Sequence, residues 1–203
     1  MKKDSDLYKT LSKVSNELLF KEKNSKFYGQ AFPVTTESDI KTFLEKVKSK
    51  HPQSNHVCYA WQLGVDVFRY RANDDGEPSN SAGMPIHGQI QSFEITNVLI
   101  TVTRYFGGTK LGVGGLISAY RTTAKMTLQT SSIIEKRVKI DVQLNFPYTE
   151  INTVMRIIKK HRLPIKNQKM ELDCQIVLSI AKSSLKNILP LFDTLQRVQT
   201  KVV

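Results

Sequence analysis

The sequence predicts an α+β protein of two domains, 1–133 and 134–203, and three observations lead to this prediction. All ten glycines lie within the first 115 residues. Residues 1–135 carry 17 basic and 13 acidic groups (+4), whereas residues 136–203 carry 13 and 5 (+8). The second part also shows strand and helix patterns in the order β-α-β-β-α-β, which is the ferredoxin-like pattern. We therefore expect an N-terminal α/β domain followed by a C-terminal ferredoxin-like domain.

The N-terminal part begins with a strand and a helix. The stretch KFYGQAFPV (26–34) alternates aromatic and small residues, which indicates a strand. Thr36, followed three positions later by Asp39, resembles a capping box with aspartate in place of glutamate. Apolar residues then recur at helical spacing up to about Lys50, so a helix is expected there.

Three further strands and a helix complete this part. HVCYAWQLG (56–64) and VDVFRYR (65–71) are expected to be two strands joined through Gly64. NVLITVTRYF (97–106) is apolar on both faces, which predicts a central strand. After the glycines that follow, apolar residues repeat in steps of three or four and predict a helix packed on the sheet: Val113, Leu116, Ile117, Tyr120, Ala124 and Leu128.

The C-terminal part alternates more simply. We expect strands at 136–146, about 163–168, 171–180 and near the final QTKVV, with helices at 148–161 and 183–196. Pro190 falls inside the last helix and should kink it or end it early, because proline cannot donate a helical hydrogen bond.

The overall composition limits the classes of function. Thirty basic residues against 18 acidic ones give a net charge of +12 and a pI near 9.7, which favours a polyanionic partner such as RNA. The N-terminus has no signal peptide pattern, and no apolar run is long enough for a membrane span, so a cytoplasmic protein without membrane contact is expected. Cys58 and Cys174 lie far apart, which argues against a thiolate zinc site.

The stretch RYFGGTKLGVGGL (104–116) places five glycines where a buried strand ends and a helix begins. Glycine lets a partner approach the main chain, and free amides at a helix N-terminus bind anions. We therefore predict an anion or RNA site, and the alternative is a tightly packed turn. It is not a P-loop, because Val113 follows Gly112 where a lysine is required. The predicted site comprises Arg104, Gly107, Gly108, Lys110, Gly112, Gly114 and Gly115.

The stretch NDDGEPSNSAGMPIHG (73–88) contains a turn at Asp75-Gly76. Its acidic residues allow a divalent metal site or acid–base chemistry, but a solvated hairpin tip is the favoured interpretation. Ser79 and Ser81 are candidate caps for a following helix. His56 and Cys58 share one face of a strand, where a nucleophile pair and ordinary packing both remain open, with packing favoured.

Four separated stretches together resemble the IMPACT/YigZ family. They are SKF (25–27), HVCYAW (56–61), DDGEPS with SAGMPI (74–86), and NVLITVTRYFGGTKLGVGGLISAY (97–120). The resemblance covers residues from about 5 to 130, and the remainder is similar to the small C-terminal domain of the bacterial members. Asn80-Ser81 departs from the usual Gly-Thr, and Met84 stands where a basic residue is frequent.

The resemblance implies an N-terminal domain like the second domain of a small-subunit ribosomal protein, and a C-terminal domain like the last domain of elongation factor G. Eukaryotic relatives regulate translation by competing for an activator of an initiation-factor kinase. The family has no agreed catalytic residues, and the resemblance implies neither cofactor nor metal. Its motif loop maps onto His56, Asp74, Asp75, Gly76, Glu77, Pro78 and Ser79.

The sequence therefore leaves two functional interpretations open. The favoured one is a non-enzymatic, translation-linked regulator that binds RNA, the ribosome or a ribosome-associated protein. Its oligomeric state is left open by the sequence, with a monomer favoured. The alternative is a hydrolase or phosphoryl-handling enzyme that uses the acidic loop and the glycine segment, with Asp74, Asp75, Glu77, Arg104 and Lys110. Convergence of the two loops on one pocket would favour the enzyme, and a broad basic face would favour binding.

Overall fold

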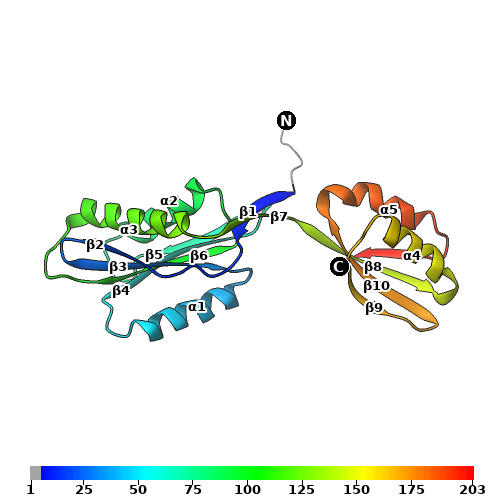
Figure 1. Cartoon of the computed structure of the whole chain (residues 1–203), viewed down its shortest axis with the longest axis horizontal. Coiled ribbons are helices and arrows are strands. Elements are labelled where there is room, and N and C mark those ends of the chain that lie inside the picture. Colours follow the sequence, from blue (N-terminus) through cyan, green and yellow to red (C-terminus); the bar gives the residue numbers. More distant parts are fainter. Residues whose placement is uncertain (1–5) are drawn as a thin grey trace. The chain divides into compact units, whose positions relative to one another are not determined.

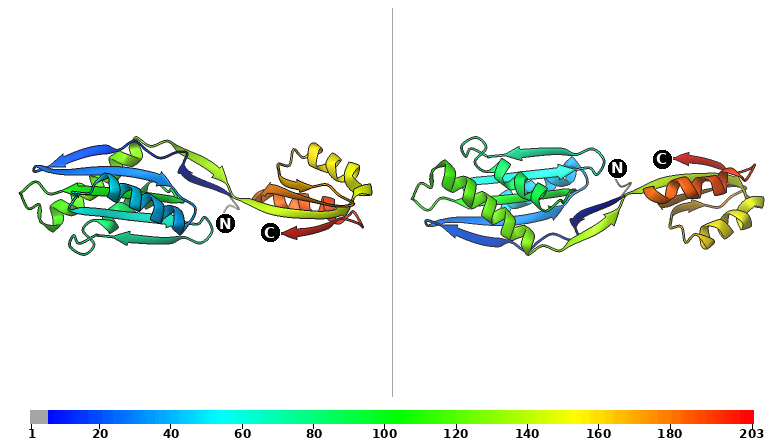
Figure 2. Two further views of the ribbon diagram at one scale, coloured as in Figure 1. Left: turned by 90° about the horizontal axis from the view of Figure 1, so that it is seen from below. Right: turned by 90° about the horizontal axis from the view of Figure 1, so that it is seen from above.

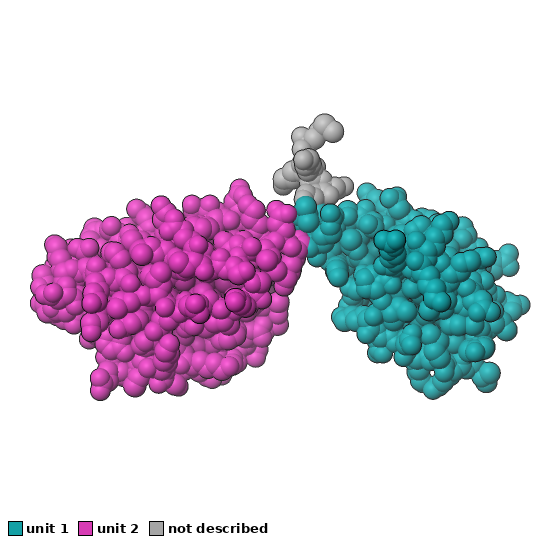
Figure 3. Space-filling view, viewed as in Figure 1, with its two compact units in different colours: residues 1–7, 137–203 teal, residues 8–136 magenta. Residues whose placement is uncertain are grey.

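The computed structural model describes residues 6–203, and the chain divides into two compact units. Residues 8–136 form one, here called the N-terminal unit. Residues 137–203, joined by Asp6 and Leu7, form the other, here called the C-terminal unit; Figure 3 colours them magenta and teal. The predicted boundary at 133/134 falls three residues before this division, and independent folding of the two units stays a prediction.

The N-terminal unit is built on a five-stranded sheet in which every neighbouring pair is antiparallel. Across the sheet the strands are β2 (Leu18–Glu22), β3 (Ser25–Pro33), β6 (Val98–Tyr105), β4 (His56–Leu63) and β5 (Arg69–Asn73). The middle strand, β6, is buried on both faces along almost its whole length. The prediction of a central strand is therefore confirmed.

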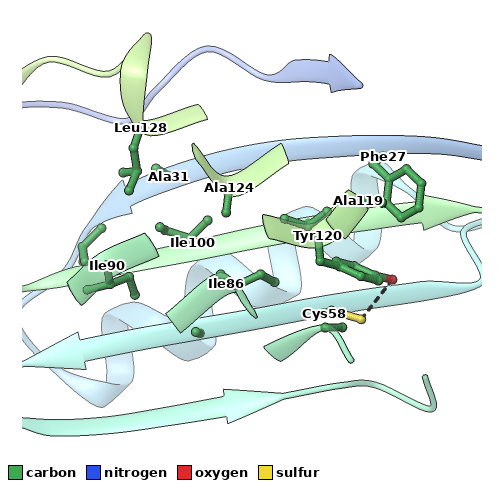
Figure 4. Close-up of a cluster of buried hydrophobic side chains, with 14 of the residues drawn as sticks. Phe27, Ala31, Cys58, Ile86, Ile90, Ile100, Ala119, Tyr120, Ala124 and Leu128 are labelled. Atoms are coloured by element: carbon green, nitrogen blue, oxygen red, sulfur yellow. Dashed lines mark hydrogen bonds between the residues drawn. The ribbon is translucent and has the colours of Figure 1, made fainter. Parts of the chain in front are cut away.

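Helices cover both faces of this sheet (Figures 1 and 2). Helix α1 (Glu37–Lys50) packs on one face, and α2 (Gly83–Ser92) and α3 (Gly112–Gln129) pack on the other. The capping box of α1 is present, with Thr36 and Asp39 exchanging hydrogen bonds as predicted. Figure 4 shows the core under α2 and α3, which contains Phe27, Ala31, Cys58, Ile86, Ile90, Ile100, Ala119, Tyr120, Ala124 and Leu128.

The sequence predictions missed several strands of this unit. Strand β2 pairs with β3 through a two-residue turn, Lys23-Asn24, whose φ angles of 42° and 66° are typical of the hairpin turns that usually contain Asn-Gly. Strands β1 (Leu7–Leu11) and β7 (Ile133–Arg137) form a separate two-stranded sheet. Strand β5 also begins four residues later than predicted, because a turn with Gly64 at φ 96° precedes it.

The C-terminal unit has the predicted β-α-β-β-α-β order. Its sheet runs β11 (Gln199–Val202), β8 (Lys139–Pro147), β10 (Asp173–Ala181) and β9 (Ile165–Lys169), and all pairs are antiparallel. Short 3-10 turns lead into α4 (Ile151–Lys160) and α5 (Leu185–Asp193). Helix α5 continues through Pro190 and ends three residues later, earlier than the predicted residue 196.

One face of this sheet packs against both helices, with Phe192 of α5 fully buried among strand residues. Asp6 is part of this unit: its carboxylate accepts hydrogen bonds from the Ser183 hydroxyl at 2.7 Å and from Arg137 Nη1 at 3.1 Å. Its main-chain oxygen also accepts one from the Val138 amide at 2.7 Å. Within residues 6–203, none of the helices is long and apolar enough to cross a bilayer.

Candidate functional site

Motif residues from distant parts of the chain meet at one end of the N-terminal unit's sheet. His56 begins β4, Arg104 lies near the end of β6 directly opposite it, and Glu77 comes from the loop before α2. Glu77 Oε1 accepts hydrogen bonds from Arg104 Nη1 at 2.7 Å and from the Tyr120 hydroxyl at 2.8 Å, and His56 Nε2 lies 3.9 Å away. The acidic loop and the end of β6 are therefore joined by this contact.

The Arg104–Glu77 ion pair is buried, with side-chain exposures of 6% and 4%. The guanidinium also lies 5.5 Å from the Phe27 ring centroid and 5.4 Å from that of Phe106, and donates to the Ser25 hydroxyl at 3.4 Å. Its charge is balanced inside the protein. Within the segment 104–116, Lys110 is thus the exposed positive charge.

Asp74 holds the N-terminus of α2. One carboxylate oxygen accepts from the amides of Ala82 and Gly83 at 2.9 and 2.8 Å, and the other accepts from the Asn80 amide at 2.9 Å. A carboxylate at this position stabilises the positive end of a helix dipole. The prediction that Ser79 or Ser81 caps α2 is wrong, because Ala82 is the cap residue and the Ser81 hydroxyl donates to the Pro78 carbonyl instead.

Asp75 closes the acidic turn onto β4. Its carboxylate accepts from the Val57 amide at 2.7 Å, and its carbonyl oxygen lies 2.7 Å from His56 Nδ1. Asp75 and Gly76 both have positive φ, 43° and 88°, which the short turn requires. The Asp74, Asp75 and Glu77 carboxylates all have partners within the protein. Among the described residues 6–203, no three or more His, Cys, Asp or Glu side chains are grouped so as to hold a metal ion.

Cys58 lies beneath this site and is fully buried. Its sulfur is 3.0 Å from the Asp74 carbonyl oxygen and 3.3 Å from the Tyr120 hydroxyl, the contact drawn in Figure 4. Burial raises the pKa of the Cys58 thiol well above its ordinary value, and it does the same to the Tyr120 phenol. Because the thiolate is the reactive form, Cys58 has the properties of a packing residue.

This environment predicts that folded protein resists alkylation at Cys58. At about pH 8.5, where a free cysteine is half ionised, iodoacetamide should leave Cys58 unmodified for hours, as followed by mass spectrometry. The same reagent in urea should modify both Cys58 and Cys174, which serves as the control. Rapid modification of Cys58 in the native protein would show that its thiol is ionised and accessible.

The glycine segment is partly helical. Helix α3 begins at Gly112, one residue before the start of the predicted helical pattern at Val113, so Gly112, Gly114 and Gly115 lie in its first turn. Gly107 is required by packing, since a Cβ there would lie 2.1 Å from the main-chain carbon of Asn24. Gly108 and Gly112 have positive φ angles of 82° and 72°.

The start of α3 is open. Its cap residue, Leu111, makes no side-chain cap, and no acidic side chain lies in the first turn. Gly114 differs from the other glycines of the segment, because its φ is ordinary and a Cβ there would meet nothing within 4 Å. The structure therefore shows no internal reason for glycine at this position.

A small hollow of about 220 Å³ lies beside this segment and was missed by the sequence predictions. It is lined by Asn24, Lys26, Tyr28, Tyr105 and Phe106. A second hollow, of about 230 Å³, includes His56 and Asp75 in its lining. One feature of the sequence could have indicated the first hollow. Lys26 and Tyr28 are two positions apart on a strand, which places both side chains on one face of the sheet.

Comparisons with known proteins agree with these motifs. The family profile described as the Impact N-terminal domain matches residues 23–128. The chain is 32% identical to "IMPACT family member YvyE" of Bacillus subtilis over 70% of this chain and 65% of that protein, and 31% identical to "IMPACT family member YigZ" of Escherichia coli over 58% and 59%. The matched regions thus span less than two thirds of either relative.

A solved structure shows the same fold over both units. The crystal structure of a hypothetical protein superposes with a TM-score of 0.75, covers 97% of each chain and is 22% identical. At this identity the likeness concerns the two-domain α+β fold alone. Together with the profile match over more than half of the sequence, the motifs at 25–27, 56–61, 74–86 and 97–120 lead to one conclusion: this chain belongs to the IMPACT family.

Proposed function

We propose that this protein is a non-enzymatic regulator linked to translation, and that it binds RNA, the ribosome or a ribosome-associated protein through the segment 107–115. Membership of the IMPACT family supports the link to translation, because the resemblance described above implies that eukaryotic relatives regulate translation. The likeness of its two domains to domains of a ribosomal protein and of elongation factor G is part of the same proposal.

The observation that carries the proposal is the open N-terminus of α3 beside Lys110. The first amides of a helix have no partner within the helix, and together with the helix dipole they favour an anion. Here neither a capping side chain nor an acidic residue occupies that position, and Lys110 is exposed next to it. The unexplained glycine at 114 leaves the main chain accessible to a bulky partner such as a phosphate backbone.

The alternative, an enzyme built on the acidic loop, has less support. Asp74 caps α2, Asp75 ties the turn to β4, and Glu77 neutralises Arg104. General acid–base catalysis requires a carboxylate that can reach a substrate, whereas Glu77 is buried against two donors. In this proposal the acidic loop is a structural clamp that holds the end of β6, and no cofactor takes part.

Binding to RNA or ribosomes should depend on Lys110 and on the space at Gly114. Lys110→Glu is expected to weaken binding and to lower the slope of log affinity against log salt by about 0.7–0.9, the contribution of one phosphate contact. Gly114→Val should weaken binding more than Lys110→Ala does, because a branched side chain keeps a phosphate away from the amides. Fluorescence anisotropy with labelled RNA and sedimentation with ribosomes would measure both.

The chain offers matched controls. Lys186→Glu makes the same charge change at an exposed residue of α5, and Gly88→Val places valine at a glycine of α2 that also has open space around it. Neither should alter binding by more than the change in net charge predicts. Affinity that is independent of salt and unaffected by the Lys110 and Gly114 variants would contradict the proposed site.

A further inference from the structure

Next to the glycine segment, strands β2, β3 and β6 present a row of side chains on one face of the sheet. Lys21 lies directly opposite Lys26, and Lys26 lies directly opposite Tyr105. Residues paired in this way point to the same face, and so do residues two positions apart, which adds Tyr28 to the same surface. Phe106 follows Tyr105 and lines the same hollow as Lys26 and Tyr28.

The two lysines concentrate positive charge on this surface. Like charges directly opposite each other on paired strands are destabilising. Both side chains are exposed, and neither forms an ion pair with any residue in the range 6–203. The acidic Glu17 is already paired with Lys50 and His51. An external anion would therefore relieve a repulsion that the fold leaves uncompensated.

The aromatic side chains are held in place before any partner binds. The Tyr28 ring lies 5.7 Å from that of Tyr105 and 5.3 Å from that of His51, measured between centroids. His51 Nδ1 is 3.0 Å from the Tyr105 hydroxyl, and its other nitrogen is 2.9 Å from Glu17. Phe106 remains 45% exposed while its ring contacts the buried Arg104. A rigid aromatic surface binds a flat ligand at a low cost in conformational entropy.

We propose that the surface formed by Lys21, Lys26, Tyr28, Tyr105 and Phe106, here called the aromatic–lysine surface, binds single-stranded RNA. The rings stack on unpaired bases and the two lysines contact the flanking phosphates. Proteins that bind single-stranded nucleic acid usually combine these two kinds of contact. Duplex RNA is not a suitable ligand, because its bases are already stacked on one another. The choice of RNA rests on the translation-linked function proposed above.

The position of the surface agrees with this assignment. Phe106 is followed directly by Gly107, which packs against the Lys23-Asn24 turn between β2 and β3. A strand whose base stacks on Phe106 would therefore carry its next phosphates toward Lys110 and the start of α3. The anion site and the aromatic–lysine surface would then form one continuous track on the N-terminal unit.

The test compares the full-length protein and its variants by fluorescence anisotropy, with a fluorescein-labelled oligouridylate and an RNA duplex of the same length. The wild type should prefer the single strand. Tyr28→Leu and Phe106→Leu should each weaken its binding about five- to a hundredfold, which is the effect of removing one stacked base. Lys21→Gln with Lys26→Gln should lower the salt slope by about 1.4, equivalent to two phosphate contacts on a single strand.

Matched variants separate stacking from loss of structure. Tyr148→Leu removes an exposed aromatic ring from the C-terminal unit, and Lys186→Gln removes an exposed positive charge there, so neither should change the affinity for oligouridylate by more than about twofold. Phe106→Trp keeps a ring at the surface and should retain or improve binding. Loss of binding in Phe106→Trp as well as in Phe106→Leu would count against stacking.

The outcomes also separate this inference from the proposed function. If oligouridylate binds but all five surface residues are dispensable while Lys110→Glu still weakens binding, the aromatic–lysine surface is wrong and the anion site stands. If neither oligouridylate nor the duplex binds but ribosomes bind in a Lys110-dependent manner, the inference is again wrong, and the proposed function stands with the ribosome as the partner. If neither RNA nor ribosomes bind, both proposals fail.

Discussion

Replacement of Glu77 by alanine is expected to destabilise the N-terminal unit by about 3–5 kcal/mol, because Arg104 is then left buried without a counter-charge. The Tyr120 hydroxyl loses its acceptor in the same step. Trp61 is the single tryptophan of the sequence and lies in this unit, so its fluorescence during urea unfolding measures the change directly.

Two further variants show whether the effect comes from the buried charge. Glu45→Ala removes an exposed carboxylate from α1 and should change the unfolding free energy by less than about 0.5 kcal/mol. Combining Glu77→Met with Arg104→Met replaces the ion pair by apolar side chains and should recover most of the loss, as buried ion pairs often permit. A loss of unfolding free energy below about 1 kcal/mol for Glu77→Ala would mean that water reaches Arg104 and that the acidic loop does not bury the ion pair.

Replacement of Phe192 by alanine should have a similarly large effect, but on the C-terminal unit alone. Phe192 is fully buried, and truncation of a buried phenylalanine costs about 3–5 kcal/mol. A unit of this size has little more stability than that, so residues 137–203 should unfold at room temperature. Limited proteolysis should then degrade them and leave a protected fragment that ends near residues 131–136.

The fluorescence of Trp61 during urea unfolding shows whether the two units unfold independently. Because each unit has its own hydrophobic core, the urea midpoint seen by Trp61 should be the same in Phe192→Ala as in the wild type, while circular dichroism loses the signal of the C-terminal unit. Leu172→Ala, at a residue that is 88% exposed, is the control and should alter neither signal. A shift of the Trp61 transition in Phe192→Ala would show that the two units unfold together.

Local signals in the sequence were enough to predict much of the fold. The capping box of Thr36 and Asp39 and the doubly apolar strand β6 both depend on neighbours within a few residues, and both are present. Strands β1 and β7 were missed because each depends on a partner more than a hundred residues away. Neither has an apolar alternation strong enough to indicate a strand by itself.

The same distinction applies to the candidate site. The glycines and Lys110 could be chosen from local spacing, because the end of a strand and the start of a helix are local features. The environment of Arg104 could not be predicted from local spacing. Its charge is neutralised by Glu77 and its position is fixed by Phe27 and Ser25, and these residues come from other segments of the chain. For this reason the sequence suggested a free cation where the structure has an internal ion pair.

The contact between Asp6 and Ser183 has a consequence for the order in which the protein is made. Asp6 leaves the ribosome long before Ser183, and 177 positions separate them. At translation rates of about 5–20 residues per second, Asp6 waits about 10–35 s for its partner. Residues 8–136, which form the N-terminal unit, have all been synthesised by then, whereas the C-terminal unit closes onto Asp6 only after residue 183 has been synthesised. A nascent chain that stalls before residue 183 therefore lacks the Ser183 hydroxyl at the Asp6 carboxylate, although Arg137 and Val138 are already available to Asp6.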